Sequence, residues 1–185
     1  MPDPLPDPET TTLAEAWDLM LPLMEYGDCE GTRCLLCGGH LQVFYRNLGK
    51  EVARVVLRLH RWDAAHPGEW AFLPRLGITG SAGYRGDYAW GRHWGLMVRH
   101  PDPREDGYKH SGWWKITDLG NAWAASAAKP EPERLKLKRY VRTFRENAIG
   151  PPYELTERGK IMPDVSITDA LGEPFDYDRF MAGEG

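Results

Sequence analysis

Residues 94–123 read WGLMVRHPDPREDGYKHSGWWKITDLGNAW. The stretch contains a short apolar run, a loop rich in Pro and charged residues, and a second apolar run that leads into Thr117. Apolar runs of this length on either side of a turn-rich segment are typical of a β-hairpin. We therefore predict strands at 96–98 and 113–116, joined by a long charged loop. Thr117 then caps a helix that extends to about residue 128.

The residues before this hairpin contain many turn signals and two short elements. Residues 63–86 are rich in Gly and Pro, and the apolar stretch 70–73 inside them predicts an edge strand. Residues 87–94 predict a short helix. Gly95 follows it, at the position where many helices end on a left-handed glycine. A helix is therefore expected directly before the hairpin.

Residues 47–62 form the clearest helical pattern in the chain, with Asn47 as its predicted cap. Its apolar face consists of Leu48, Val52, Val55, Val56, Leu59 and Trp62. Four cations recur along another face and are called the cation row. The cation row consists of Lys50, Arg54, Arg58 and Arg61. It predicts either a ridge that contacts phosphates or an ordinary helix face that solvent or an acidic segment covers.

Charge is unevenly distributed along the sequence. Residues 1–30 contain eight acidic residues and no Lys or Arg. Residues 31–145 contain 20 basic and 10 acidic residues, a net charge of +10, and residues 146–185 contain 3 basic and 9 acidic residues, a net charge of −6. A basic middle between acidic ends is compatible with a polyanionic partner despite the overall charge of −4. An ordinary surface of mixed charge is the alternative.

All three cysteines lie between positions 29 and 37, and an odd number in so short a segment does not indicate a disulfide framework. The CxxC spacing, with two glycines after it, is typical of a zinc knuckle. The predicted ligands of one structural zinc ion are Cys29, Cys34, Cys37 and His40. His60, His66 or an acidic side chain is an alternative fourth ligand. Three reduced thiols without a metal are the alternative to the whole site.

The two ends of the chain carry weaker patterns. The N-terminal part predicts an acidic, Pro-rich tail and an amphipathic helix, which begins at a capping box formed by Thr12 and Glu15. In the C-terminal part, residues 135–144 predict strands, although their apolar spacing also fits a helix. Further along, a strand is expected at 165–167. Helical turns are expected at 168–171 and 176–181.

Several functional classes lack a sequence signal. No apolar run approaches the length of a membrane span, and the N-terminus lacks the pattern of a secretory signal. We therefore expect a soluble, cytoplasmic protein without membrane contact. The histidines are scattered, and no nucleophile elbow, phosphate-binding loop or dinucleotide fingerprint is present. Enzymatic activity is therefore not expected.

Residues 47–128 resemble the winged-helix transcription regulators of the MarR and ArsR kind. The resemblance rests on the helix at 87–94, on Gly95-Leu96-Met97, and on Lys115-Ile116-Thr117-Asp118-Leu119-Gly120 after the charged loop. It implies that the helix before the wing enters the major groove of DNA and that the wing contacts phosphates or the minor groove. The residues that it assigns to DNA contact are Arg85, Tyr88 and Arg92 on the helix, and Arg99, Arg104, Lys109 and His110 on the wing.

The CxxC segment and residues 167–177 also resemble uncharacterised small proteins of phages and mobile elements, which carry no established activity. Such a protein would act in the cytoplasm of the host. Together these patterns divide the chain into residues 1–28, 29–46, 47–128 and 129–185. They predict an α+β protein: a winged helix-turn-helix core, an N-terminal helix, a zinc-knuckle-like element and a small α+β C-terminal extension.

We therefore expect a non-catalytic protein that binds duplex DNA in a regulatory role. The alternative is a protein-binding module that modulates a cellular or host machine through its acidic surfaces. The aromatic cluster Trp113, Trp114 and Trp123 is expected to be core, with base stacking as the alternative.

Overall fold

The chain is represented by a computed structural model. The structure describes residues 12, 15, 18–19, 32–33, 40–41, 43–78, 87–101, 112–144, 147–148, 151–153, 156–157 and 160–184. The chain divides into two compact units. The first consists of Met1–Tyr45 and Arg142–Gly150, and the second of Arg46–Val141 and Pro151–Gly185. The elements combine helices with short antiparallel sheets, so the α+β class is confirmed.

In the first unit, the predicted capping box is present. The backbone N–H of Thr12 donates to the Glu15 carboxylate at 2.8 Å, and the backbone N–H of Glu15 donates to the Thr12 hydroxyl at 3.3 Å. The Thr12 hydroxyl also donates to this carboxylate at 2.7 Å, and the bonds from the Thr12 hydroxyl and then from its backbone N–H lower the pKa of Glu15. Strand β1 (Thr32–Arg33) pairs with β2 (His40–Leu41) in an antiparallel ladder.

A three-stranded sheet contains β3 (Val43–Asn47), β7 (Tyr140–Phe144) and β8 (Asn147–Ala148), in the order β3-β7-β8. The hydroxyl of Thr143 donates to the carbonyl of Phe44 at 3.3 Å. The strand that was predicted across 135–144 is therefore confirmed at its C-terminal half, and the helical alternative for that half is wrong.

The core of the second unit is built around α2 (Lys50–Ala65). The predicted helix was expected to begin at Asn47. Instead Asn47 ends β3, and Gly49 occupies the N-cap position without a side-chain hydrogen bond. Because Asn47 belongs to β3 and Gly49 also has an extended backbone, with φ of −114° and ψ of −169°, the helix begins at Lys50. Its buried residues are Val52, Ala53, Val55, Val56, Leu57 and Leu59.

Two 3₁₀ helices follow α2 along the sequence: η1 (Leu73–Leu76) and η2 (Asp87–Trp94). The short helix predicted at 87–94 is therefore present, with 3₁₀ geometry. A Cβ at Gly91 would lie 3.0 Å from Cγ1 of Val52, so glycine allows η2 to pack closely on α2. Gly95 ends η2 with a φ of +71°, as predicted.

The hairpin is confirmed, with β5 at Met97–Arg99 and β6 at Trp113–Ile116. Strand β4 (Ala71–Phe72) pairs with the other side of β6, which gives the sheet order β4-β6-β5. Trp114 and Ile116 are buried, whereas Trp113 points away from the core and is 36% exposed. The expectation that all three tryptophans are core therefore holds for Trp114 and Trp123 but not for Trp113.

Helix α3 (Asp118–Ala125) follows the hairpin, and η3 (Ser126–Ala128) continues it, as predicted. The Thr117 hydroxyl accepts the backbone N–H of Gly120 at 3.1 Å and donates to the Gly95 carbonyl at 2.6 Å. One side chain therefore caps α3 and ties it to the end of η2.

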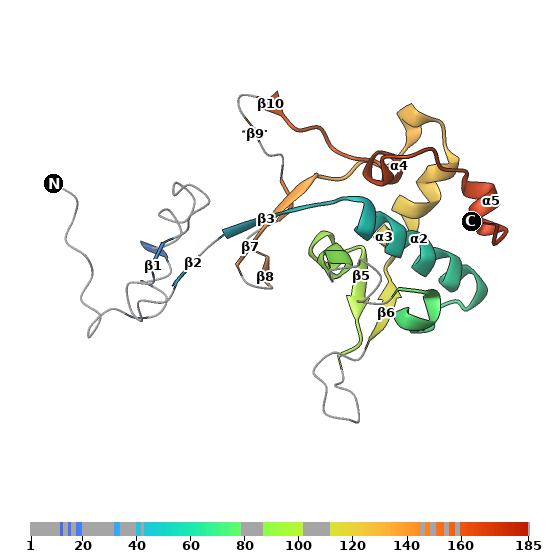
Figure 1. Ribbon diagram of the computed structural model, residues 1–185, viewed down its shortest axis with the longest axis horizontal. Coiled ribbons are helices and arrows are strands. Elements are labelled where there is room, and N and C mark those ends of the chain that lie inside the picture. The colour runs from blue at the N-terminus through green and yellow to red at the C-terminus, as the bar shows by residue number, and fades with distance from the viewer. Residues whose placement is uncertain are drawn as a thin grey trace. The chain divides into compact units, whose positions relative to one another are not determined.

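The C-terminal part of this unit contains η4 (Glu131–Glu133), β9 (Thr156–Glu157) and β10 (Lys160–Ile161), then α4 (Ile167–Leu171) and α5 (Tyr177–Met181). In Figure 1, α4 and α5 lie on one side of α2 and the hairpin β5–β6 lies on the other.

The prediction of a strand at 165–167 is wrong for its last two residues. Only Val165 pairs, in an isolated bridge with Leu137. Ser166 forms a capping box with Asp169, so Ile167 is already the first helical residue. Local capping therefore overrides the apolar run in this segment.

Candidate functional site

The cation row of α2 divides into two halves with different partners. In the first half, Nζ of Lys50 lies 2.7 Å from one carboxylate oxygen of Glu173, and Nη2 of Arg54 lies 3.1 Å from the other. Hydrogen bonds from Lys50 and then from Arg54 hold the pKa of Glu173 below its usual range. One carboxylate of the C-terminal segment thus compensates two cations that are one helical turn apart.

In the second half, the cations bind neutral acceptors. Nη1 of Arg58 donates to the carbonyl oxygens of Leu76 at 3.2 Å and Gly77 at 3.3 Å. Nη1 of Arg61 donates to the carbonyl of Phe180 at 2.9 Å, and its guanidinium lies 4.6 Å from the centre of the Phe180 ring. A carbonyl or an aromatic ring orients a guanidinium without cancelling its charge. These two arginines therefore remain available to an anion.

Arg58 and Arg61 line a hollow of about 350 Å³ at the C-terminal end of α2, which we call the arginine hollow. Its other lining residues are Trp62, Ala65, His66, Arg75 and Leu76. Within the part of the chain that the structure describes, no carboxylate lines it. Three arginine residues therefore line one concave surface to which the described part of the chain contributes no acidic residue, and this arrangement favours binding of an anion.

One wall of the arginine hollow is aromatic. The rings of Trp62 and His66 stack with their centroids 3.9 Å apart and an angle of 15° between their planes. Nδ1 of His66 lies 3.2 Å from the carbonyl oxygen of Trp62, which fixes the orientation of the imidazole. The hollow thus combines cationic residues with a planar aromatic pair.

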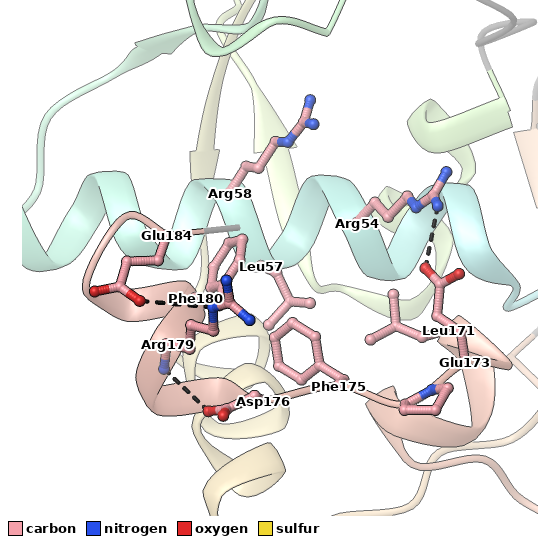
Figure 2. A pocket seen from close by; sticks show the side chains of 11 residues that line it. Arg54, Leu57, Arg58, Leu171, Glu173, Phe175, Asp176, Arg179, Phe180 and Glu184 are labelled. Atoms are coloured by element: carbon pink, nitrogen blue, oxygen red, sulfur yellow. Dashed lines mark hydrogen bonds and ion pairs between the residues drawn. The ribbon is translucent and has the colours of Figure 1, made fainter.

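A larger hollow of about 640 Å³ lies between α2 and the C-terminal segment (Figure 2). Leu57 of α2 and Phe175 point toward each other across it, and Arg54 and Glu173 form an ion pair at one end. Each of its carboxylates has a partner in the chain. Asp176 accepts the backbone N–H of Arg179 at 3.0 Å, and Glu184 lies 3.5 Å from Nε of Arg179. We therefore interpret this hollow as part of the packing interface between α2 and the C-terminal segment.

The helix residues assigned to DNA by the winged-helix resemblance have varied surroundings. Tyr88 is half-buried, and its ring packs edge-on against Trp114 with centroids 6.1 Å apart. Burial raises the pKa of Tyr88. This side chain therefore packs on the core side of η2. Arg92 and Arg99 are both partly buried, in η2 and at the end of β5.

Further predicted residues lie outside the described part of the chain. They are Arg85, Arg104, Lys109, His110, Cys29, Cys34 and Cys37. Of the predicted zinc ligands, only His40 is described, and it pairs with Arg33 across β1 and β2. His60, an alternative ligand, lies 2.8 Å from Asn121 and 2.7 Å from Tyr177. Among the described residues, no group of three metal-ligating side chains of the His, Cys, Asp or Glu type comes together.

A second aromatic and cationic cluster surrounds η2. The guanidinium of Arg46 lies 4.1 Å from the centre of the Trp90 ring, and the His93 ring stacks near Trp90 with centroids 5.5 Å apart. Burial, then the charges of Arg92 and Arg46, lower the pKa of His93 to about 4. His93 is therefore neutral at physiological pH.

Comparisons with known protein families, with curated proteins and with solved structures find no match to this chain. Within the described residues, no helix has both the length and the apolar character needed to cross a membrane.

Sequence reasoning found two members of the arginine hollow, Arg58 and Arg61, because they recur at helical spacing. It missed Arg75 as a lining residue of this hollow, because a single arginine beside Pro74 in a turn-rich segment has no periodicity. It also missed Glu173, whose pairing with α2 joins residues far apart in the sequence.

Proposed function

We propose that this protein is a non-catalytic, regulatory DNA-binding protein that contacts phosphates through the arginine hollow. The observation that carries the proposal is the convergence of Arg58, Arg61 and Arg75 on one hollow that no described carboxylate lines. Guanidinium groups bind phosphate oxygens in a forked geometry, and phosphate contacts supply most of the affinity of DNA-binding proteins.

The order of elements supports a winged-helix form of this proposal. Helix η2 precedes the hairpin β5–β6, α3 follows it, and β4 extends the same sheet. In this form the loop of the hairpin is the wing, and its sequence contains Arg104, Lys109 and His110. The wing and the arginine hollow would then provide separate phosphate contacts.

The experiment is a titration of a labelled duplex of about 20 base pairs at several salt concentrations. We expect the logarithm of the binding constant to fall linearly with the logarithm of salt, because binding releases counterions. Arg75→Gln is expected to weaken binding at each salt concentration and to reduce the slope by about one. Arg75 is exposed at the end of η1, so its replacement leaves the core intact.

Lys129→Gln is the matched control, since it removes one exposed positive charge from a residue that does not line the arginine hollow. It is expected to bind like the wild type. Equal weakening by both variants would show that only overall charge matters. No binding of the wild type at low salt would refute the proposal.

A second candidate function is protein binding, which the exposed apolar side chains near the hairpin favour. Val98 on β5, Trp113 on β6 and Leu119 on α3 are 44%, 36% and 39% exposed. A partner that packs on them would bind with little dependence on salt. Val98→Asp would then abolish capture of the partner while leaving DNA binding unchanged. Contacts made by the acidic ends of the chain would add a salt-dependent part to the affinity for the partner.

A further inference from the structure

We propose that the arginine hollow binds a phosphate monoester, such as the phosphate at the 5′ end of a DNA strand. This inference rests on the proposed DNA binding and names the chemical group that the site recognises. It distinguishes a terminal phosphate from the phosphodiesters along the strand.

The charge of the site favours a monoester. A phosphate monoester carries about −1.5 to −2 charges at neutral pH and presents three unesterified oxygens. A phosphodiester carries one negative charge and has two free oxygens. Three arginine residues line the arginine hollow, and no carboxylate of the described chain lines it. A dianion therefore gains more from this site than a diester does.

The shape of the site also favours a strand end. The arginine hollow has a volume of about 350 Å³, which lies within the range of small-molecule sites. A concave site of this size accommodates a phosphate and part of its nucleotide. The phosphates of an intact duplex lie on a convex surface with sugars on both sides, so they reach the rim of such a hollow more easily than its floor.

Two of the three guanidinium groups are already oriented. The bonds from Arg58 to the carbonyls of Leu76 and Gly77, and from Arg61 to the carbonyl of Phe180, involve only Nη1 of each arginine. A guanidinium has five N–H donors, so each can hold its carbonyl and an anion at the same time. Ordering the side chains in advance lowers the entropic cost of binding.

The stacked pair of Trp62 and His66 provides a surface for the nucleoside. Its planar aromatic rings suit a terminal base, which in an unpaired strand end is free to stack. Leu76 and Ala65 add apolar surface to the same lining. The site thus places an apolar wall beside three cations, which matches a nucleotide with a terminal phosphate.

The test compares two duplexes of identical sequence with short unpaired 5′ overhangs, one with 5′-phosphate and one with 5′-hydroxyl ends, at one salt concentration. We expect the phosphorylated duplex to bind at least about tenfold more tightly. The preference should disappear in Arg75→Gln and persist in Lys129→Gln. In a separate arm, deoxyadenosine 5′-monophosphate should raise the Tm of the wild type, and deoxyadenosine should not. Circular dichroism confirms that each variant is folded.

The outcomes separate this inference from the proposed function. Equal binding of both duplexes, with no stabilisation by the nucleotide, overturns the monoester site and leaves DNA binding intact. Stabilisation by the nucleotide without binding to either duplex supports the site and refutes the DNA-binding function. Binding of a phosphoserine peptide, when neither DNA nor the nucleotide binds, supports a phosphate-monoester site and refutes the 5′ end of a DNA strand as its ligand.

Discussion

Replacing Gly120 by alanine tests how closely α3 packs on the hairpin. A Cβ at this position would overlap the carbonyl oxygen of Leu96 and lie 2.7 Å from Cγ1 of Ile116. The Leu96 carbonyl cannot turn away freely, because it accepts the backbone N–H of Thr117 at 3.1 Å. To make room, α3 must move away from the hairpin and take the fully buried Trp123 with it.

The magnitude follows from two opposing effects. Alanine is more favourable than glycine inside a helix by about 1 kcal/mol. Forcing an extra carbon into a packed interface costs about 1–3 kcal/mol and more when the obstacle is backbone. Because here the obstacle is a backbone carbonyl, we expect Gly120→Ala to destabilise the protein by about 2 kcal/mol net. For a chain of this length, that lowers the Tm by about 4–8 °C.

Urea denaturation measures the change, with an unaltered m-value as the sign that the unfolded states are comparable. Ala122→Gly is the control, since Ala122 is exposed on the same helix. It should lose about 1 kcal/mol through helix propensity alone. A Gly120→Ala variant as stable as the wild type would refute the close packing of α3 on Leu96.

Four further predictions concern other parts of the chain. Thr117→Ala should cost about 1–2 kcal/mol in urea denaturation, because it removes both the helix cap and the bond to Gly95, whereas Thr117→Ser should cost less. The lowered pKa of His93 means that its contribution to stability is complete above the unfolded pKa of about 6.5 and is lost as the pH falls through about 4. His93→Gln should therefore flatten the pH dependence of Tm in this window, and an unchanged profile would contradict the burial of the ring. Glu173→Gln should strengthen binding to duplex DNA, because it releases Lys50 and Arg54 from their ion pairs. The control Glu133→Gln removes an exposed charge on η4 and should not strengthen binding. Equal effects of the two substitutions would contradict a specific role of Glu173. Metal analysis of protein purified without chelator should give about one zinc per chain, lost in Cys34→Ser, and a folded metal-free protein would rule out the predicted site.

The elements that sequence reasoning placed correctly are those whose signals are local. The pattern from Gly95 to Thr117 combines a helix-ending glycine, an apolar pair of strands and a capping threonine, and each depends on neighbours a few residues away. The capping box of Thr12 and Glu15 is correct for the same reason. The errors arose where a local signal had two outcomes. Asn47 can cap a helix, but in the structure it is the last residue of strand β3.

The candidate site was only half predictable. Helical spacing identified the cation row, and it left open whether an acidic segment covers it. The structure shows different contacts for each half: Glu173 of the C-terminal segment pairs with Lys50 and Arg54, whereas Arg61 meets the carbonyl and ring of Phe180 in that segment, and Arg58 donates to the carbonyls of Leu76 and Gly77. That distinction depends on how α4 and α5 pack on α2, which involves contacts between residues more than one hundred positions apart.

By itself, the sequence determined the α+β class, the hairpin with its capped helix, and the four cations on one face of α2. These follow from periodicity and capping, which act within a few residues. Only the tertiary structure decided which cations of α2 pair with a carboxylate. It also decided that Arg75 lines the same hollow as Arg58 and Arg61, beside the stacked rings of Trp62 and His66. The physical reason is that the effect of a charge depends on the groups within a few ångströms of it, and folding brings those groups from distant parts of the chain.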